Sequence, residues 1–177
     1  GMVDISRFYK DDQVKQEECR NKIMLASSFL LDLVNSVLDM NKLESGEVKL
    51  EEKPFRMSRL LKETSGVLEM QARECGITLN VCNEADEHDC LIGSPVHLGQ
   101  VLQNIIGNAI KYNNDSGTVD VTCREISYDG NTAGFEFVCA DTGIGMSEEF
   151  QQHAFEPFAQ ENESARTSYA GTGLGLP

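Results

Sequence analysis

The chain has 177 residues, of which 40% are hydrophobic and 25% are charged, and this composition is ordinary for one globular domain with a short helical appendage. Its 15 basic and 29 acidic side chains give a formal net charge of −14. So acidic a chain is a poor match for nucleic acid or for anionic membrane surfaces, and we expect neither as a partner.

The sequence carries no feature of a secreted or membrane-spanning segment. Its longest apolar run is too short for a bilayer, and its first residues do not resemble a secretory signal. The six cysteines form no Cys-x-x-Cys pair and lie mostly in apolar stretches, which indicates buried thiols in a reducing compartment. We therefore expect a cytoplasmic segment without direct membrane contact, even if the parent protein is anchored to a membrane.

The first 45 residues are predicted to be helical, with a break at residues 10–13 before a long helix over residues 14–43. Apolar residues of this helix recur every seven positions in two adjacent rows, namely Ile23, Leu30 and Val37, and Met24, Leu31 and Leu38. So broad a stripe fits a helical bundle. The helix could pack on the chain's own globular part, but we favour a homodimer, because the preceding stub is too short to cover the stripe.

The remaining chain is predicted to mix two amphipathic helices with short strands. The helices are expected at residues 56–75 and within residues 93–113. The strands are expected at residues 48–50, 77–81, 90–92, 118–126 and 133–140, with a turn at Pro54 and an acidic loop at residues 83–89. The last two strands are separated by a hairpin turn, and a tail rich in Gly and polar residues follows. Segregated helices and mostly antiparallel strands predict an α+β sandwich.

The helix within residues 93–113 has an unusual polar face. Apolar side chains occupy one side of it, and Gln100, Asn104, Asn108 and Lys111 gather on the other. Carboxamide oxygens can ligate a hard divalent cation, and an ammonium group can meet phosphate. An uncharged solvent-facing helix surface explains the same pattern equally well, so this stretch alone leaves both interpretations open.

Two glycine-rich stretches follow the hairpin. The first, Asp-x-Gly-x-Gly, holds Asp141, Gly143 and Gly145 directly after a strand, where a carboxylate can face a pocket while backbone approaches a ligand. The second, Gly-x-Gly-x-Gly, holds Gly171, Gly173 and Gly175 and offers backbone donors for phosphate; a Phe-x-Pro-Phe sequence at residues 155–158 lies between the two. Each stretch alone is weak evidence of a site.

In this order, the Asn-containing helix and the three later motifs resemble the catalytic, ATP-binding domain of two-component sensor histidine kinases. That family belongs to the wider gyrase, chaperone and mismatch-repair ATPase superfamily. Residues 31–55 also resemble the second helix of the family's dimerisation bundle and its link to the ATP-binding domain. The resemblance implies a two-layer α/β sandwich preceded by a helical-hairpin dimerisation segment. Residues 1–46 would belong to the dimerisation and phosphoacceptor bundle, and residues 47–177 to the ATP-binding domain.

The resemblance implies ATP and Mg²⁺ as cofactors and assigns roles on the polar helix face. Asn108 would ligate Mg²⁺, Asn104 would support the metal or its waters, and Lys111 would contact phosphate. ATPases of the superfamily have a Glu where this chain has Asn104. A carboxamide cannot take a proton from water, so the resemblance implies phosphoryl transfer rather than hydrolysis.

The adenine is expected to lie at the first glycine-rich stretch. By the same resemblance Tyr112 would stack beside the base, and Asp141 would accept a hydrogen bond from its exocyclic amine. Gly143 and Gly145 would give the base room.

Residues 156–170 would form a flexible lid over ATP. Arg166 is the only cation in that segment and is a candidate phosphate contact. Gly171, Gly173 and Gly175 would free the hinge of the lid and present N–H groups to phosphate.

None of the three histidines, His88, His97 and His153, fits the family's acceptor pattern, in which the histidine is followed by an acidic residue and then by Thr-Pro or Asn-Pro. The resemblance therefore implies that the chain begins just after the acceptor and ends at Pro177 before the family's next helix, so we expect it not to phosphorylate itself. A histidine kinase segment would pair with a second copy of itself and with a response-regulator receiver domain. A non-catalytic docking module with a degenerate nucleotide site and an ATPase of the same superfamily are the alternatives.

Overall fold

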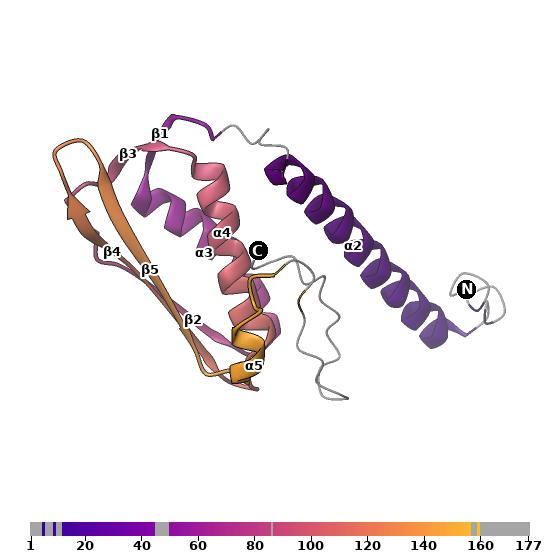
Figure 1. The fold of residues 1–177 in the computed structure, drawn as a ribbon. Coiled ribbons are helices and arrows are strands. Elements are labelled where there is room, and N and C mark those ends of the chain that lie inside the picture. Colours follow the sequence, from indigo (N-terminus) through magenta and orange to yellow (C-terminus); the bar gives the residue numbers. More distant parts are fainter. Residues whose placement is uncertain are drawn as a thin grey trace. The chain divides into compact units, whose positions relative to one another are not determined.

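A computed structural model describes residues 5, 9, 12–44, 50–85, 87–156 and 159 (Figure 1). The chain divides into two compact units, one that includes the N-terminal helix and one that includes residues 49–156. Each unit is described here by itself.

The N-terminal unit contains one long helix, α2 (Gln13–Glu44), which confirms the predicted helix to within one residue at each end. Asp12 caps its start, because its side chain accepts a hydrogen bond of 3.1 Å from the backbone N–H of Lys15. Leu30 and Leu31 of the two heptad rows are exposed on it, and so is Val34, which lies between the rows in the same apolar stripe. In the part of the chain that the structure describes, no helix is both long and apolar enough to cross a bilayer.

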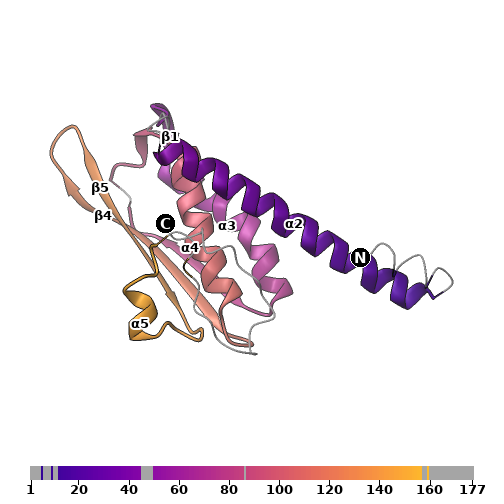
Figure 2. The same cartoon turned by 45° about the vertical axis from the view of Figure 1, so that its right-hand side comes forward.

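The second unit is a two-layer α/β sandwich. Its main sheet has the order β2-β4-β5, formed by Thr78–Asn83, Thr118–Tyr128 and Ala133–Asp141. β2 is parallel to β4, and β5 is antiparallel to it. The helices α3 (Met57–Glu74) and α4 (Pro95–Lys111) lie side by side and cover one face of this sheet (Figure 2).

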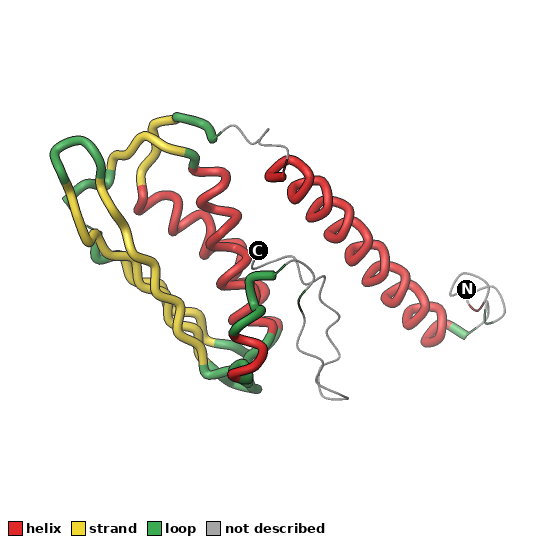
Figure 3. Tube along the Cα trace, in the orientation of Figure 1, coloured by secondary structure: helices red, strands yellow, loops and turns green. Residues whose placement is uncertain are grey.

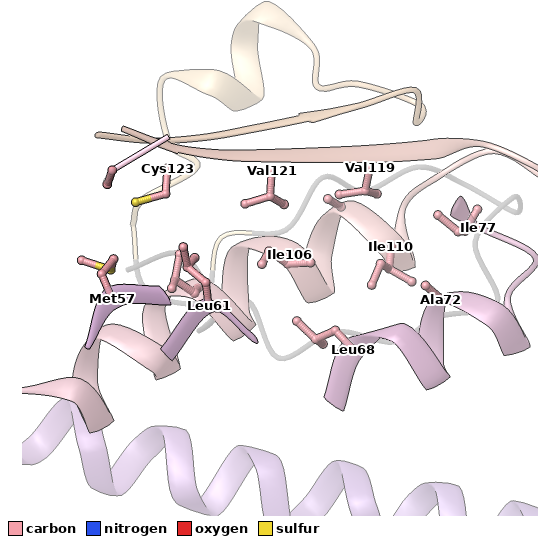
Figure 4. Packing of buried hydrophobic residues seen from close by; sticks show 13 residues of the cluster. Met57, Leu61, Leu68, Ala72, Ile77, Ile106, Ile110, Val119, Val121 and Cys123 are labelled. Atoms are coloured by element: carbon pink, nitrogen blue, oxygen red, sulfur yellow. The ribbon is translucent and has the colours of Figure 1, made fainter. Parts of the chain in front are cut away.

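Alternation along β4 places the core between the sheet and the helices. Val119, Val121 and Cys123 are fully buried, whereas Asp120 and Arg124 are exposed on the other face. The side chains packed against the sheet come from both helices (Figure 4), and those labelled on them are Met57, Leu61, Leu68, Ala72, Ile106 and Ile110. The predicted sandwich is confirmed.

A second, two-stranded sheet corrects one prediction. Leu50 is outside any strand, and residues 48–49 lie outside the described residues; the strand is instead β1 (Lys53–Arg56), where Pro54 had predicted a turn. β1 pairs only with β3 (Cys90–Gly93), in antiparallel register. A strand with one neighbour tolerates proline, because the N–H that Pro54 lacks is not needed on its open edge.

The β4–β5 hairpin continues as a two-stranded ribbon beyond the end of β2 (Figure 3). β2 pairs with β4 only as far as Cys123, while β4 and β5 stay paired out to Tyr128 and Ala133. At the opposite end, the chain leaves β5 at Asp141 and soon forms a short helix, α5 (Glu148–Gln151), which the sequence analysis placed in the tail without a prediction.

Candidate functional site

α4 presents the predicted polar face away from the core. Its apolar side buries Leu102 and Ile106, while Asn104 is exposed and Asn108 and Lys111 are half-buried. The burial pattern follows the helical period and places the carboxamides and the ammonium group away from the core, where two apolar residues, Val101 and Ile105, are also exposed.

The C-terminal end of α4 is formed by Tyr112, whose backbone N–H donates to the carbonyl of Asn108 at 2.9 Å. The Lys111 ammonium lies over the Tyr112 ring, 4.9 Å from its centroid, as a cation–π contact. The structure therefore places two of the predicted site residues against each other at the end of the helix.

Hydrogen bonds tie this helix end to the loop after β5, about thirty positions further along the chain. The backbone N–H of Ile144 donates to the carbonyl of Tyr112 at 3.1 Å. The Thr142 hydroxyl donates to the Asn113 side chain at 3.0 Å and accepts from the N–H of Thr118 at 2.9 Å. The tether brings the two predicted halves of the site, at residues 111–112 and 141–145, to one end of the sheet.

Asn113 and Thr142 are neighbours of the predicted site residues that the sequence analysis did not identify. Residues 113–117 form a turn, in which the Gly117 N–H donates to the Asn114 carbonyl at 3.0 Å. Asn at a turn is too common to indicate a tether, and the partner Thr142 is distant in sequence.

Gly143 lies where no side chain fits. A Cβ atom there would overlap the carbonyl oxygen of Tyr112 and lie 3.1 Å from the Asn113 Cα. Gly145 has a φ of 69°, in the left-handed region that favours glycine. These two glycines of the first motif are therefore required by close backbone approach and by backbone conformation, respectively.

The Asp141 carboxylate is exposed at the end of β5. Its Oδ1 accepts a hydrogen bond of 2.8 Å from the N–H of Gly143, two residues along. This bond orients the carboxylate, and the described residues provide no hydrogen-bond donor for its Oδ2. An oriented carboxylate with one oxygen available can accept from the amine of a ligand.

Two thiols lie in the main sheet. Burial, together with the nearby carboxylates of Asp141 and Asp120, raises the pKa of Cys139 to about 11. Burial alone raises the pKa of Cys123 to about 11. Both thiols are therefore protonated at neutral pH and poor as nucleophiles.

Arg166, Gly171, Gly173 and Gly175 lie outside the described residues, and so does Phe158 of the Phe-x-Pro-Phe sequence. Phe155, its first aromatic residue, is exposed. The lid and its hinge stay predictions.

A shallow groove of about 580 Å³ lies elsewhere on this unit, between α3 and the small sheet. It is lined by Phe55, Arg59, Leu60 and Ile92 among others, and it contains none of the predicted site residues. The predicted site residues thus gather at the Tyr112–Asp141 end and not at this groove.

Comparison with known proteins shows what the chain is similar to. Residues 93–177 match the family described as histidine kinase-, DNA gyrase B- and HSP90-like ATPase. The signal transduction histidine-protein kinase BarA of Escherichia coli (strain K12) is 34% identical over 161 residues, which are 91% of this chain and 17% of BarA. The chain thus spans only a small part of this relative.

Solved structures are similar as well. Full-length ShkA in complex with AMPPNP superimposes with a TM-score of 0.72 and 26% identity, over 97% of this chain and 35% of ShkA. The histidine kinase ThkA, solved in complex with the response regulator protein TrrA, has the same fold, with a TM-score of 0.64 and 22% identity over 89% of this chain and 46% of ThkA.

Proposed function

We propose that this chain, whose residues 93–177 match the histidine kinase-, DNA gyrase B- and HSP90-like ATPase family, is of the sensor histidine kinase type and binds Mg-ATP for phosphoryl transfer to a histidine. The γ-phosphorus would leave the β–γ bridging oxygen and bond to an imidazole nitrogen, with ADP as the leaving group. The observation that carries the proposal is the tether that brings Tyr112 and Asp141 to one end of the sheet.

The adenine half of the site rests on Asp141 and its loop. Because Oδ1 is held by the Gly143 N–H, Oδ2 is the oxygen that would accept from the exocyclic amine. Tyr112, half-buried at the helix end, would lie beside the base. Gly143 lets the loop that carries Asp141 approach the helix end closely, since a Cβ atom there would overlap the Tyr112 carbonyl oxygen.

The phosphate half rests on the polar face of α4. Asn108 would hold Mg²⁺, with Asn104 supporting it, and Lys111 would contact phosphate; two carboxamide oxygens and no thiol form a donor set that suits this hard ion. Bound Mg²⁺ would neutralise phosphate charge, which matters on a chain with a net charge of −14. The chain's own residues would orient the nucleotide. The Asn104 carboxamide cannot accept a proton from water, so it would not act as a general base for hydrolysis.

We propose that none of the three histidines of this chain is the phosphate acceptor, because the side chain of each already contacts a neighbouring polar side chain. His97 lies 2.6 Å from the Ser94 hydroxyl, and His153 pairs with Glu156 at 2.9 Å, which raises its pKa. His88 pairs with Glu125. Incubation with labelled ATP should therefore leave no phosphohistidine on this chain, and label mapped to one of the three would contradict the assignment.

We propose residues 1–46 as a dimerisation segment and residues 47–177 as the nucleotide-binding domain, with a response-regulator receiver domain as the partner. The exposed apolar rows of α2 support the dimerisation segment. The ThkA–TrrA complex, in which ThkA has the same fold, supports a receiver domain as the partner.

Titration with ADP and Mg²⁺, followed by calorimetry, tests the nucleotide site. Asp141→Asn should weaken binding at least about tenfold, because the amide replaces an acceptor with a donor at one position. Asp120→Asn is the matched control, since Asp120 is exposed on the outer face of the same sheet and bonds only Asn80. Equal affinity of wild type and Asp141→Asn would refute the adenine assignment, and no binding by the wild type would favour the degenerate docking module.

A further inference from the structure

We propose that Glu87, His88 and Glu125 form a binding site for a late first-row divalent metal ion such as Zn²⁺. The site lies at the end of the domain opposite to Asp141. It does not depend on the proposed nucleotide function.

The topology of the sheet brings these residues together. β2 runs parallel to β4 and ends at Asn83, opposite Cys123. The chain then continues alongside β4, where the N–H of Glu84 donates to the Cys123 carbonyl at 2.8 Å. The loop that follows therefore passes the next core-facing residue of β4, which is Glu125.

The donor atoms are spaced as metal ligands are. His88 Nδ1 lies 2.9 Å from Oε1 and 3.1 Å from Oε2 of Glu125. A ligand oxygen of Glu87 joins them, and the three ligand atoms lie within 4.8 Å of one another. Ligands at about 2.0–2.1 Å from Zn²⁺ are separated by about 3.0–3.4 Å, so small side-chain adjustments would close the set around one ion.

The charges of the cluster call for a cation. Two carboxylates meet one imidazole, and Glu125 is largely buried, with 14% of its side chain exposed. No lysine or arginine in the described part of the chain forms an ion pair with either carboxylate. Glu125 alone would be a sufficient partner for the His88 imidazole. The second carboxylate, Glu87, adds repulsion between the two negative charges, which a divalent ion would relieve.

The imidazole is held in place before any ion binds. The ladder between β4 and β5 shifts register between Glu125 and Ser127, which makes Ile126 an extra residue in the strand. The bulge turns Tyr128 to the same face as Glu125. There its ring stacks on His88 at 3.9 Å between centroids, with 27° between planes.

The donor chemistry selects the class of ion. One imidazole nitrogen and two carboxylates suit Zn²⁺, Co²⁺ or Ni²⁺, whereas Mg²⁺ and Ca²⁺ prefer oxygen alone. The site is distinct from the proposed Mg-ATP site, because Thr118 and Glu125 are about 23 Å apart along β4 at about 3.3 Å per residue. Nδ1 would bind the ion with the ring proton on Nε2, and an imidazole protonated on both nitrogens would first release one proton to the buffer.

Calorimetric titration of the full chain with Zn²⁺, without nucleotide, tests the proposal. We expect one site whose affinity rises with pH and falls at least about tenfold in His88→Ala and in Glu125→Gln. His153→Ala is the matched control, because His153 pairs with Glu156 at the same 2.9 Å but belongs to no three-ligand cluster in the described residues. Far-UV circular dichroism checks that each variant is folded.

Exposed thiols are the competing ligands, and Co²⁺ spectra separate them from the proposed site. Cys75, Cys82 and Cys90 are exposed. A variant with these three changed to Ser should bind Zn²⁺ as the wild type does, and Co²⁺ should give no thiolate charge-transfer band. Retained affinity in both His88→Ala and Glu125→Gln, or loss of binding in the Ser variant, would overturn the proposal.

Discussion

Gly143 and Cys139 show how single residues near the Tyr112–Asp141 end of the sheet are constrained by what surrounds them. At Gly143 the constraint is space, because backbone of Tyr112 and Asn113 occupies the position of a side chain. At Cys139 it is burial together with negative charge. Neither constraint depends on the residue's own chemistry, and each leads to a measurable outcome.

Gly143→Ala should displace the loop that holds Asp141, because the added methyl group would overlap the Tyr112 carbonyl oxygen. We expect weaker ADP binding, by about tenfold or more, and a lower melting temperature. Gly66→Ala is the control: Gly66 lies in α3, is exposed and has nothing within 4 Å of a built Cβ atom, so the substitution should stabilise the helix by about 0.5–1 kcal/mol. Unchanged ADP affinity in Gly143→Ala would show that the loop adapts.

Cys139 should react with iodoacetamide slowly at pH 8, and its rate should keep rising towards pH 11, since only the thiolate is nucleophilic and its pKa is about 11. Cys82, exposed on β2, is the comparison within the same chain. Alkylation followed by peptide mass spectrometry measures both rates. A Cys139 rate that levels off below pH 9 would contradict the raised pKa.

At the scale of elements, the start of α3 depends on a residue from another part of the chain. Arg56 at the N-cap position makes no side-chain cap. Asp89 supplies it instead: its Oδ1 accepts from the N–H of Ser58 at 2.7 Å, and its carbonyl accepts from the N–H of Met57 at 2.9 Å. The cap joins the helix to the loop before β3.

Asp89→Ala should lower the free energy of unfolding by about 1 kcal/mol, the usual effect of losing a helix cap. The Ser58 N–H holds the pKa of Asp89 below its usual value, with Arg56 as a lesser cause. The stabilisation is thus present above the unfolded pKa of about 3.9 and is lost as pH falls through the lower folded value. Urea unfolding at pH 7 and pH 3 measures this difference.

Asp89→Asn should lose less stability than Asp89→Ala at pH 7, because an amide oxygen can still accept from Ser58. If both variants match the wild type at pH 7, the cap does not stabilise α3.

At the scale of the whole molecule, the exposed apolar rows of α2 predict self-association. Sedimentation equilibrium should give twice the chain mass of 19.6 kDa. Val34→Lys should return the protein to the monomer mass, because Val34 lies in the middle of the stripe and is exposed in the single chain. Glu18→Lys, on the opposite side of the helix, adds charge without touching the stripe and should remain dimeric. A monomeric wild type would remove the support for a homodimer.

The sequence by itself determined the sandwich and the helices, because apolar residues recur every 3.6 positions in a helix and every 2 positions in a strand that buries one face. It also predicted the polar face of α4 and the glycines beside Asp141. The strand near residue 50 is predicted in the wrong place because Pro54 indicates a turn in the sequence. An open sheet edge tolerates the missing N–H of proline, and the sequence does not show which strand lies at an edge.

Only the tertiary structure decided how distant residues meet. The Asn113–Thr142 tether, the Asp89 cap on α3 and the pairing of His88 with Glu125 each join positions about thirty residues apart. A periodic pattern can place polar side chains on one face of a helix, but it does not show which distant side chains pair, because partners are set by the order of the strands and the path of the loops. The strongly periodic apolar positions were therefore predictable, and the polar contacts that shape the proposed sites were not.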